Sequence, residues 1–296
     1  MTDLAAGPVR TLPLAPAELY EGPLWHPERE RLFVFSILDG TLQSVAADGS
    51  DRCEWRLGER ASAAGIIDRD RLLIATETGL WRLHLETGEK HPLVPLEADD
   101  PRTRSNDGRA APDGAFWIGT MGLQAENALG ALYRYDANDE PPLTSLKRRV
   151  SIPNSTCFAS DGSVAYFSDT AERVIRRVRL ENGRPTGDWE PHIDLSADGL
   201  NPDGAVVDEE NCLWCAMFGA GEVQRFSPDG ERIGAVAVPA KQPTCPAFGG
   251  PDMRTLFVTS AWENMGDARG PDDGAVFAVE TNARGRADPR VRVPAA

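Results

Sequence analysis

The sequence of 296 residues lacks the features of secreted and membrane-spanning chains. Its N-terminus, MTDLAAGPVRTLPLAPAELYEGP, contains no basic start followed by an apolar run, so we expect no secretory signal. No stretch approaches eighteen consecutive apolar residues, which argues against a membrane-spanning helix. The five cysteines are odd in number and irregularly spaced. That pattern indicates reduced thiols and predicts a cytoplasmic protein.

Basic residues are also scarce, because 31 lysines and arginines face 46 aspartates and glutamates, a formal net charge of −15. Such a chain repels nucleic acid and anionic membranes, and we expect neither as a partner. The four histidines form no H-E-x-x-H motif, and no G-x-S-x-G sequence is present. These absences argue against a histidine-based zinc protease site and against a serine hydrolase of the α/β type.

Helical periodicity is rare, and short strand-like runs separated by Asp-Gly, Thr-Gly and Asn-Gly turns recur instead. Aligned on each other, these runs form six units roughly 40–50 residues apart, the spacing of propeller blades. The units begin at Glu21, Ala61, Ser105, Pro153, Asn201 and Cys245.

We therefore predict an all-β fold, a six-bladed β-propeller that forms a single domain over residues 1–296. Within the segment 1–20, VRTLPLA is expected to be a strand that completes the last blade. A two-sheet sandwich is the alternative, but it does not explain why six units share turn type and strand order. A closed propeller exposes few strand edges, so a monomer is the expected state.

The position just before the innermost strand of each blade faces one mouth of the central channel, and it is polar in four of the six units. Across the units it is occupied by Glu21, Ala63, Asn106, Asn154, Asp203 and Cys245. Asn and Asp also favour turns, which is the simpler explanation for any one of them. Glu is no turn former, however, and polar groups in a dry channel need compensation. The pattern predicts one divalent cation, bound through oxygen ligands.

The chain resembles the gluconolactonase/regucalcin-like family, also called the senescence marker protein family. The resemblance extends over nearly the whole chain. It rests on EGPLW, RSNDGR, GTMG, IPNSTCFASDG with YFSDT, NPDGAVVD, LWCAMFGAGEVQRF and CPAFGGPDMRTLFVTSA, in that order. This family consists of six-bladed propellers that hydrolyse sugar lactones, which agrees with the repeat count.

By resemblance, Glu21, Asn154 and Asp203 would hold the metal, one of Ca²⁺, Zn²⁺, Mn²⁺, Mg²⁺ or Fe²⁺. Arg104 and Asn106 would contact a small-molecule sugar lactone, an aldonolactone. Some members carry a substrate-contacting glutamate where this chain has Gln124. Gln124 is the candidate substrate-binding residue there, and Glu126 lies two positions later.

The implied reaction opens the lactone to the aldonic acid, with the metal polarising the carbonyl. The catalytic residue would be Asp203, activating water as a base, or a metal-bound hydroxide would attack instead. Two alternatives stay open: a non-catalytic calcium-binding or regulatory protein, and a phosphotriesterase-like hydrolase on the same scaffold. The segment from Pro95 to Thr103 is a candidate lid over the channel.

Overall fold

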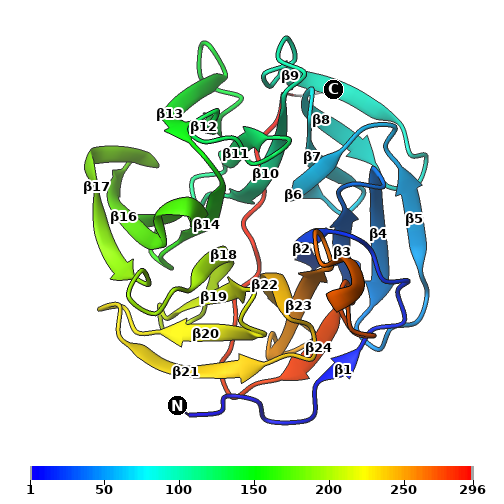
Figure 1. Ribbon diagram of the computed structural model, residues 1–296. Helices are drawn as coiled ribbons and strands as arrows, with labels where there is room; N and C mark the ends of the chain where they lie inside the picture. Colours follow the sequence, from blue (N-terminus) through cyan, green and yellow to red (C-terminus); the bar gives the residue numbers. More distant parts are fainter. Residues whose placement is uncertain (1, 295–296) are drawn as a thin grey trace.

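The computed structural model describes residues 2–294, which form six four-stranded antiparallel sheets arranged in a ring (Figure 1). Blade one consists of β2 (Tyr20–His26), β3 (Arg31–Ser36), β4 (Thr41–Ala46) and β5 (Cys53–Arg56). Blade two consists of β6 (Ala61–Asp68), β7 (Arg71–Thr76), β8 (Gly79–His84) and β9 (Lys90–Pro95). Blade three consists of β10 (Thr103–Ala110), β11 (Phe116–Gly122), β12 (Gly130–Tyr135) and β13 (Leu143–Val150).

The remaining blades repeat this plan. Blade four consists of β14 (Pro153–Phe158), β15 (Val164–Asp169), β16 (Val174–Glu181) and β17 (Arg184–Asp194). Blade five consists of β18 (Asn201–Val207), β19 (Leu213–Phe218), β20 (Glu222–Phe226) and β21 (Arg232–Ala237). Blade six consists of β22 (Gln242–Gly249), β23 (Thr255–Ala261), β24 (Phe277–Glu280) and β1 (Arg10–Thr11). The predicted six-bladed β-propeller is therefore confirmed.

Blade six joins the two ends of the chain. Strand β1 pairs antiparallel with β24, with Arg10 opposite Ala278 and Thr11 opposite Phe277. The strand lies in the VRTLPLA segment, so an N-terminal strand is hydrogen-bonded into a sheet whose other strands come from residues 242–280. Two short 3₁₀ helices complete the regular structure, η1 (Thr170–Glu172) and η2 (Gly266–Ala268). No helix in residues 2–294 has the length and apolarity needed to cross a membrane.

Large aromatic side chains pack the blades against each other. The Trp25 ring of blade one stacks on Phe257 of blade six, with centroids 5.7 Å apart. The Trp214 ring of blade five meets Phe248 of blade six edge-on at 5.4 Å. Burial of such rings is a strong apolar contribution to stability, and their offset and edge-on geometries are the favoured ones. The tryptophans therefore hold neighbouring blades in contact, which fixes the channel that the inner strands surround.

The C-terminal segment closes one end of that channel. It runs across the centre of the ring (red in Figure 1), from Gly285, whose N–H donates to Met253, to Val291, whose N–H donates to Ile66. On the way, Asp288 accepts two hydrogen bonds from the buried Arg109 guanidinium, at 2.9 and 3.2 Å. These contacts join the segment to blades six, two and three at the carboxyl ends of their inner strands.

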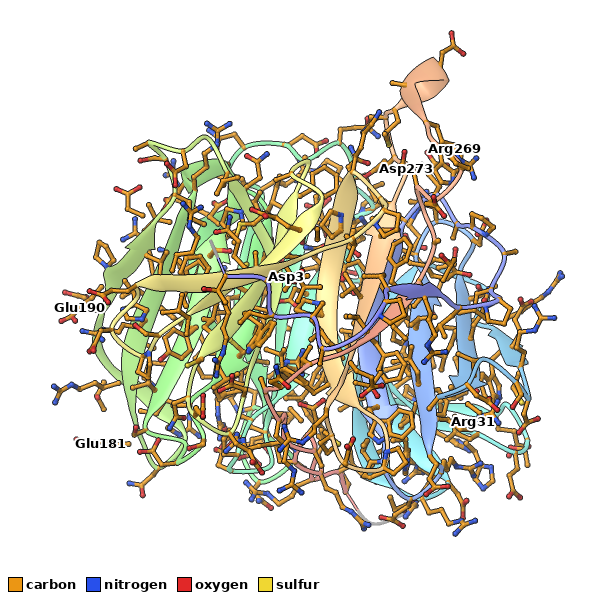
Figure 2. The ribbon with its side chains drawn as sticks, turned by 90° about the horizontal axis from the view of Figure 1, so that it is seen from below. Asp3, Arg31, Glu181, Glu190, Arg269 and Asp273 are labelled. Carbon is orange, nitrogen blue, oxygen red and sulfur yellow. The ribbon has the colours of Figure 1, made fainter. Side chains whose placement is uncertain are left out.

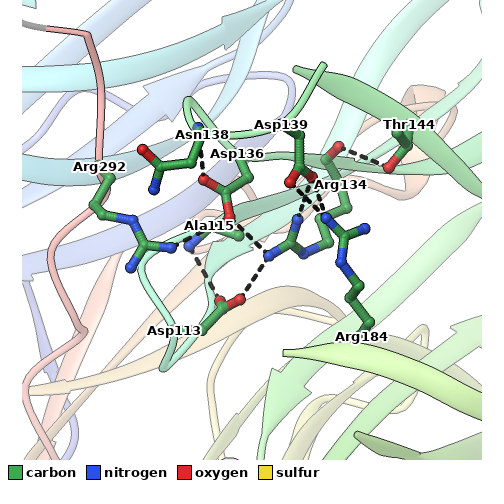
Figure 3. Close-up of polar contacts among 9 residues, drawn as sticks. All are labelled: Asp113, Ala115, Arg134, Asp136, Asn138, Asp139, Thr144, Arg184 and Arg292. Carbon is green, nitrogen blue, oxygen red and sulfur yellow. Dashed lines mark hydrogen bonds and ion pairs between the residues drawn. The ribbon is translucent and has the colours of Figure 1, made fainter. Parts of the chain in front are cut away.

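An ion network further anchors the end of this segment (Figure 3). Arg134, only 1% exposed, is its centre. Its guanidinium donates to Asp113, Asp136 and Asp139 at 2.6–2.9 Å. Arg292 of the C-terminal segment also donates to Asp136, at 3.2 Å. The buried carboxylate of Asp136 thus has two guanidinium partners.

Candidate active site at the open end of the channel

The opposite end of the channel opens into a cavity of about 520 Å³. It lies where the inner strands begin. The structure brings all six predicted site residues into its lining: Glu21, Arg104, Asn106, Gln124, Asn154 and Asp203. Apart from Gln124, which follows β11, they lie in the inner strands β2, β10, β14 and β18 rather than just before them.

A bulge in each inner strand aims these side chains at the channel axis. The pairing register shifts between Glu21 and Leu24 in β2, and a shift recurs near the start of every other inner strand. Bulges redirect side chains out of the pleat, here toward the cavity. In β2 the bulge requires Gly22, which has φ +55° and whose added Cβ would lie 2.2 Å from the Ser62 carbonyl oxygen. This explains the glycine of the EGPLW sequence.

The carboxyl groups at the cavity floor are buried together. Glu21 is 5% exposed and Asp203 7%. Burial, reinforced by the charge of Asp107, raises the pKa of Glu21 to about 8. Burial and the charge of Glu21 raise the pKa of Asp203 well above its usual value. Neither carboxylate lies within 4.0 Å of an arginine, lysine or histidine nitrogen in residues 2–294, so the chain itself supplies no direct cationic partner.

A chain of hydrogen bonds fixes the amide groups beside these carboxylates. Arg104 Nη1 donates to Asn106 Oδ1 at 2.8 Å, and Asn106 Nδ2 donates to Asn154 Oδ1 at 3.1 Å. Asn154 Nδ2 in turn donates to Thr170 Oγ1 at 2.8 Å. Because its nitrogen is committed to Thr170, Asn154 presents its oxygen toward the channel. The side chain is thus oriented as an oxygen donor.

This donor set fits a divalent cation. Two buried carboxylates and one oriented amide oxygen are hard ligands, and three protein ligands leave coordination positions open for substrate. A cation between Glu21 and Asp203 would also neutralise the charges that burial disfavours. The residues predicted as ligands therefore have the chemistry that such an ion requires.

A second acidic group, in blade five, does not fit a divalent cation. Asp208, Glu210 and Cys212 could place ligand atoms within 4.8 Å of one another. Asp208 Oδ2, however, already accepts from Arg225 Nε and Nη2 and from Trp214 Nε1 at 2.6–2.9 Å. Arg225 also pairs with Glu210. The guanidinium thus occupies the place that a cation would take.

Several residues in or beside the cavity were not predicted from the sequence. Asp107 does not line the cavity itself; it is 5% exposed, its Oδ2 accepts from the Thr156 N–H at 2.7 Å, and its charge acts on Glu21. Glu18 and Glu263 line the mouth of the cavity. The NDG of RSNDGR could have indicated Asp107, but Glu18 and Glu263 lie outside the repeated motifs. No residue of the Pro95–Thr103 segment lines the cavity, so the structure gives no support for a lid there.

Two cysteines of blade five, Glu126 and His26 have well-defined surroundings. Cys212 and Cys215 are both buried free thiols, in keeping with ordinary core cysteines. Glu126 accepts from the Gln124 N–H at 2.9 Å and shapes the loop, while the Gln124 side chain lines the cavity. His26 Nε2 donates to the Asp68 carbonyl oxygen at 3.1 Å, far along β2 from Glu21.

Comparison with known proteins places this arrangement in a family. Residues 19–262 match the sequence profile described as the SMP-30/Gluconolactonase/LRE-like region. The chain belongs to this family. The resemblance inferred from EGPLW and the other motifs is thus confirmed.

Solved and curated members of the SMP-30/gluconolactonase family cover nearly the full chain. A structure from Agrobacterium tumefaciens, described as the calcium-binding protein regucalcin, has a TM-score of 0.94 and 37% identity over 99% of this chain and 100% of its own. The 6-deoxy-6-sulfogluconolactonase of Pseudomonas putida is 34% identical over 93% of this chain and 95% of its own. The L-arabinolactonase of Azospirillum brasilense is also 34% identical, over 92% and 91%. The expectation of a hydrolase of lactone esters agrees with these names.

Proposed function

We propose that this protein hydrolyses aldonolactones with the help of one divalent cation held by Glu21, Asn154 and Asp203. The observation that carries the proposal is a pair of buried carboxylates that have no ion-pair partner among residues 2–294, beside an oriented amide oxygen, at the floor of a cavity of about 520 Å³. A cavity of this size is at the scale of small-molecule sites. The lactonase names of two relatives support the reaction class.

The cation supplies Lewis-acid polarisation of the lactone carbonyl when it is bound. Its identity is one of Ca²⁺, Mg²⁺, Mn²⁺, Zn²⁺ and Fe²⁺, since oxygen ligands accept all of them. The relative described as calcium-binding favours Ca²⁺ as the first ion to test.

The chain's own residues complete the chemistry. Asp203 accepts the proton of the attacking water as the oxygen of that water bonds to the lactone carbonyl carbon. The same carboxyl then returns the proton to the ring oxygen as the carbon–oxygen ring bond breaks, which gives the open aldonic acid. Arg104 donates hydrogen bonds to the substrate oxygens, with its Nη1 held by the Ser105 carbonyl and Asn106 at 2.9 and 2.8 Å.

Gln124 and Asn106 are the remaining substrate contacts in this proposal. Asn106 bonds to Arg104 and Asn154 and therefore positions both. The Gln124 amide can both donate and accept, which suits the hydroxyl groups of a sugar. The relatives leave the identity of the sugar open, because one is named for an arabinolactone and the other for a sulfonated gluconolactone.

A calcium-binding role without catalysis is the second candidate, favoured by the description of the Agrobacterium relative. It would use the same three ligands. It would not require the free donors of Arg104 to face the cavity.

The test is turnover by protein first stripped of metal and then given each of the five ions separately. Acid release from fresh glucono-, galactono-, arabino- and xylonolactone would be followed against the spontaneous rate in buffer. Asp203→Asn is the test variant. Asp208→Asn is its control, because Asp208 is a buried carboxylate of the same blade whose charge is balanced by Arg225.

We expect turnover that requires an ion, is lost by at least about 10³-fold in Asp203→Asn, and persists per folded molecule in Asp208→Asn. Ion binding without any acceleration of lactone opening would overturn the enzyme proposal in favour of the calcium-binding role. Equal rates with and without chelator would overturn the proposal that turnover requires a metal ion. Hydrolysis of phosphate triesters but of no lactone would favour the phosphotriesterase-like alternative.

A further inference from the structure

Two carboxylates line the mouth of the cavity from neighbouring blades. Glu18 precedes β2, and Glu263 follows β23. The Trp262 N–H donates to the Glu18 carbonyl oxygen at 3.0 Å, so the two backbone segments are hydrogen-bonded side by side. Both side chains are partly buried. We call this pair, Glu18 and Glu263, the acidic wall.

Neither carboxylate of the acidic wall forms a direct ion pair within the described part of the chain. Among residues 2–294 neither Glu18 nor Glu263 takes part in an ion pair within 4.0 Å, although the cavity contains two arginines. Arg60 Nη1 lies 3.0 Å from Glu77 Oε2, and Glu77 lies outside the cavity lining. Arg104 faces Glu263, Glu21 and Asp203, and these charges oppose the lowering of its pKa by burial.

No positively charged side chain of the cavity therefore remains unbalanced. A bound divalent ion balances Glu21 and Asp203, Arg104 balances one carboxylate of the acidic wall, and Arg60 is balanced by Glu77. One negative charge remains at the mouth. Substrate entering with an anionic group at the far end of its tail would be repelled, whereas hydroxyl groups could donate to these carboxylates.

We propose that Glu18 and Glu263 select aldonolactones with uncharged, hydroxyl-bearing tails and reject those whose tail carries an anion. The inference depends on the proposed lactonase function and identifies its substrate class. It distinguishes between the two kinds of substrate for which the relatives are named, a neutral lactone and a sulfonated one.

The loop that carries Glu263 is built to hold its position. Residues 262–274 project from the face of the propeller on which the cavity opens, with Arg269 and Asp273 in the projecting part (Figure 2). Arg269 lies over the Trp262 ring at 4.4 Å. Asp273 accepts from the N–H groups of Lys241 and Gly270, both at 2.7 Å. These contacts hold the loop, and therefore Glu263, in position.

The test compares kcat/KM for gluconolactone and for 6-deoxy-6-sulfogluconolactone, which differ in the charge of the tail. Wild type, Glu263→Gln, the double variant Glu18→Gln/Glu263→Gln and Glu263→Lys would be assayed with the same metal. Asp267→Asn is the matched control, because it removes one negative charge from the same loop at a residue outside the cavity lining. Thermal melting would verify that each variant is folded.

We expect wild type to prefer the neutral lactone and each removed charge to reduce that preference roughly tenfold, the scale of one charge pair across a partly solvated cavity. Glu263→Lys should reduce it further, Asp267→Asn should leave it unchanged, and added salt should weaken the effect. An equal preference in wild type and the double variant, or a wild type that favours the sulfonated lactone, would overturn the inference alone. If wild type opens no lactone, the proposed function fails and the inference with it.

Discussion

The two ends of the channel treat buried negative charge in opposite ways. At the closed end, Asp288 is paired with Arg109, and Asp136 is paired with both Arg134 and Arg292. At the open end, Glu21 and Asp203 are only 5% and 7% exposed but have no guanidinium or ammonium group within 4.0 Å in the described part of the chain. The first arrangement satisfies its charges within the chain, while the second leaves them to be satisfied by something that binds.

The difference separates structural from functional carboxylates. A buried charge that keeps its partner contributes to a unique fold, and removing that partner is costly. A buried carboxylate without a partner raises its pKa and disfavours the metal-free folded state, a cost that is accepted where a ligand will offset it. By this criterion the C-terminal closure is structural, and the open end is where we propose the functional site.

The largest expected effect is at the closed end. Asp288→Asn leaves the Arg109 guanidinium buried without its two hydrogen bonds to a carboxylate, so we expect a loss of about 3–5 kcal/mol in the free energy of unfolding. Urea denaturation measures it. Glu28→Gln is the control, because it removes the exposed pair that Glu28 forms with Arg290 of the same segment and should cost under about 1 kcal/mol. Equal losses in both variants would remove the distinction between the two ends.

At the open end, the corresponding substitution should affect binding and not stability. Glu21→Gln removes an anionic ligand, and we expect divalent-ion affinity to fall by at least about 100-fold, more than the loss of a residue that only orients a ligand. The free energy of unfolding of the metal-free variant should not fall, since a disfavoured charge has been removed. Titration calorimetry measures the ion affinity, and urea denaturation in chelator measures the free energy of unfolding of the metal-free variant. A destabilised metal-free variant would show that Glu21 is structural.

A smaller effect, counted per pH unit, is expected for the dependence of the free energy of unfolding on pH. The pKa of Glu21 is raised from 4.5 to about 8 in the folded chain, so between these values the folded state keeps a proton that the unfolded state has lost. The free energy of unfolding of metal-free protein should therefore fall as pH rises through this window, by about 1.4 kcal/mol per pH unit for this group. The difference in free energy of unfolding between wild type and Glu21→Gln, measured in chelator across this pH range, isolates the contribution of Glu21. A saturating ion should abolish this pH dependence. A difference that is independent of pH would contradict the shift.

Much of the architecture was readable in the sequence because it repeats. Six runs of strand and turn residues with the same order predicted six blades, and the polar residues at one phase of the repeat predicted that Glu21, Asn106, Asn154 and Asp203 would meet. What the repeat could not predict is the bulge in each inner strand, since the shift in register depends on how neighbouring strands pack. The residues were therefore expected just before the strands in which they lie.

The sequence by itself determined the blade count and the group of residues at the channel mouth, because both follow from short-range patterns of apolar and turn-forming residues. Only the tertiary structure decided which carboxylates remain without a cation. Asp203 and Asp208 are five positions apart in one blade, yet one faces an open cavity and the other faces Arg225. Glu18 and Glu263 meet only because the ring closes between blades one and six. Charge balance depends on distances through space, and these are set when the six blades close.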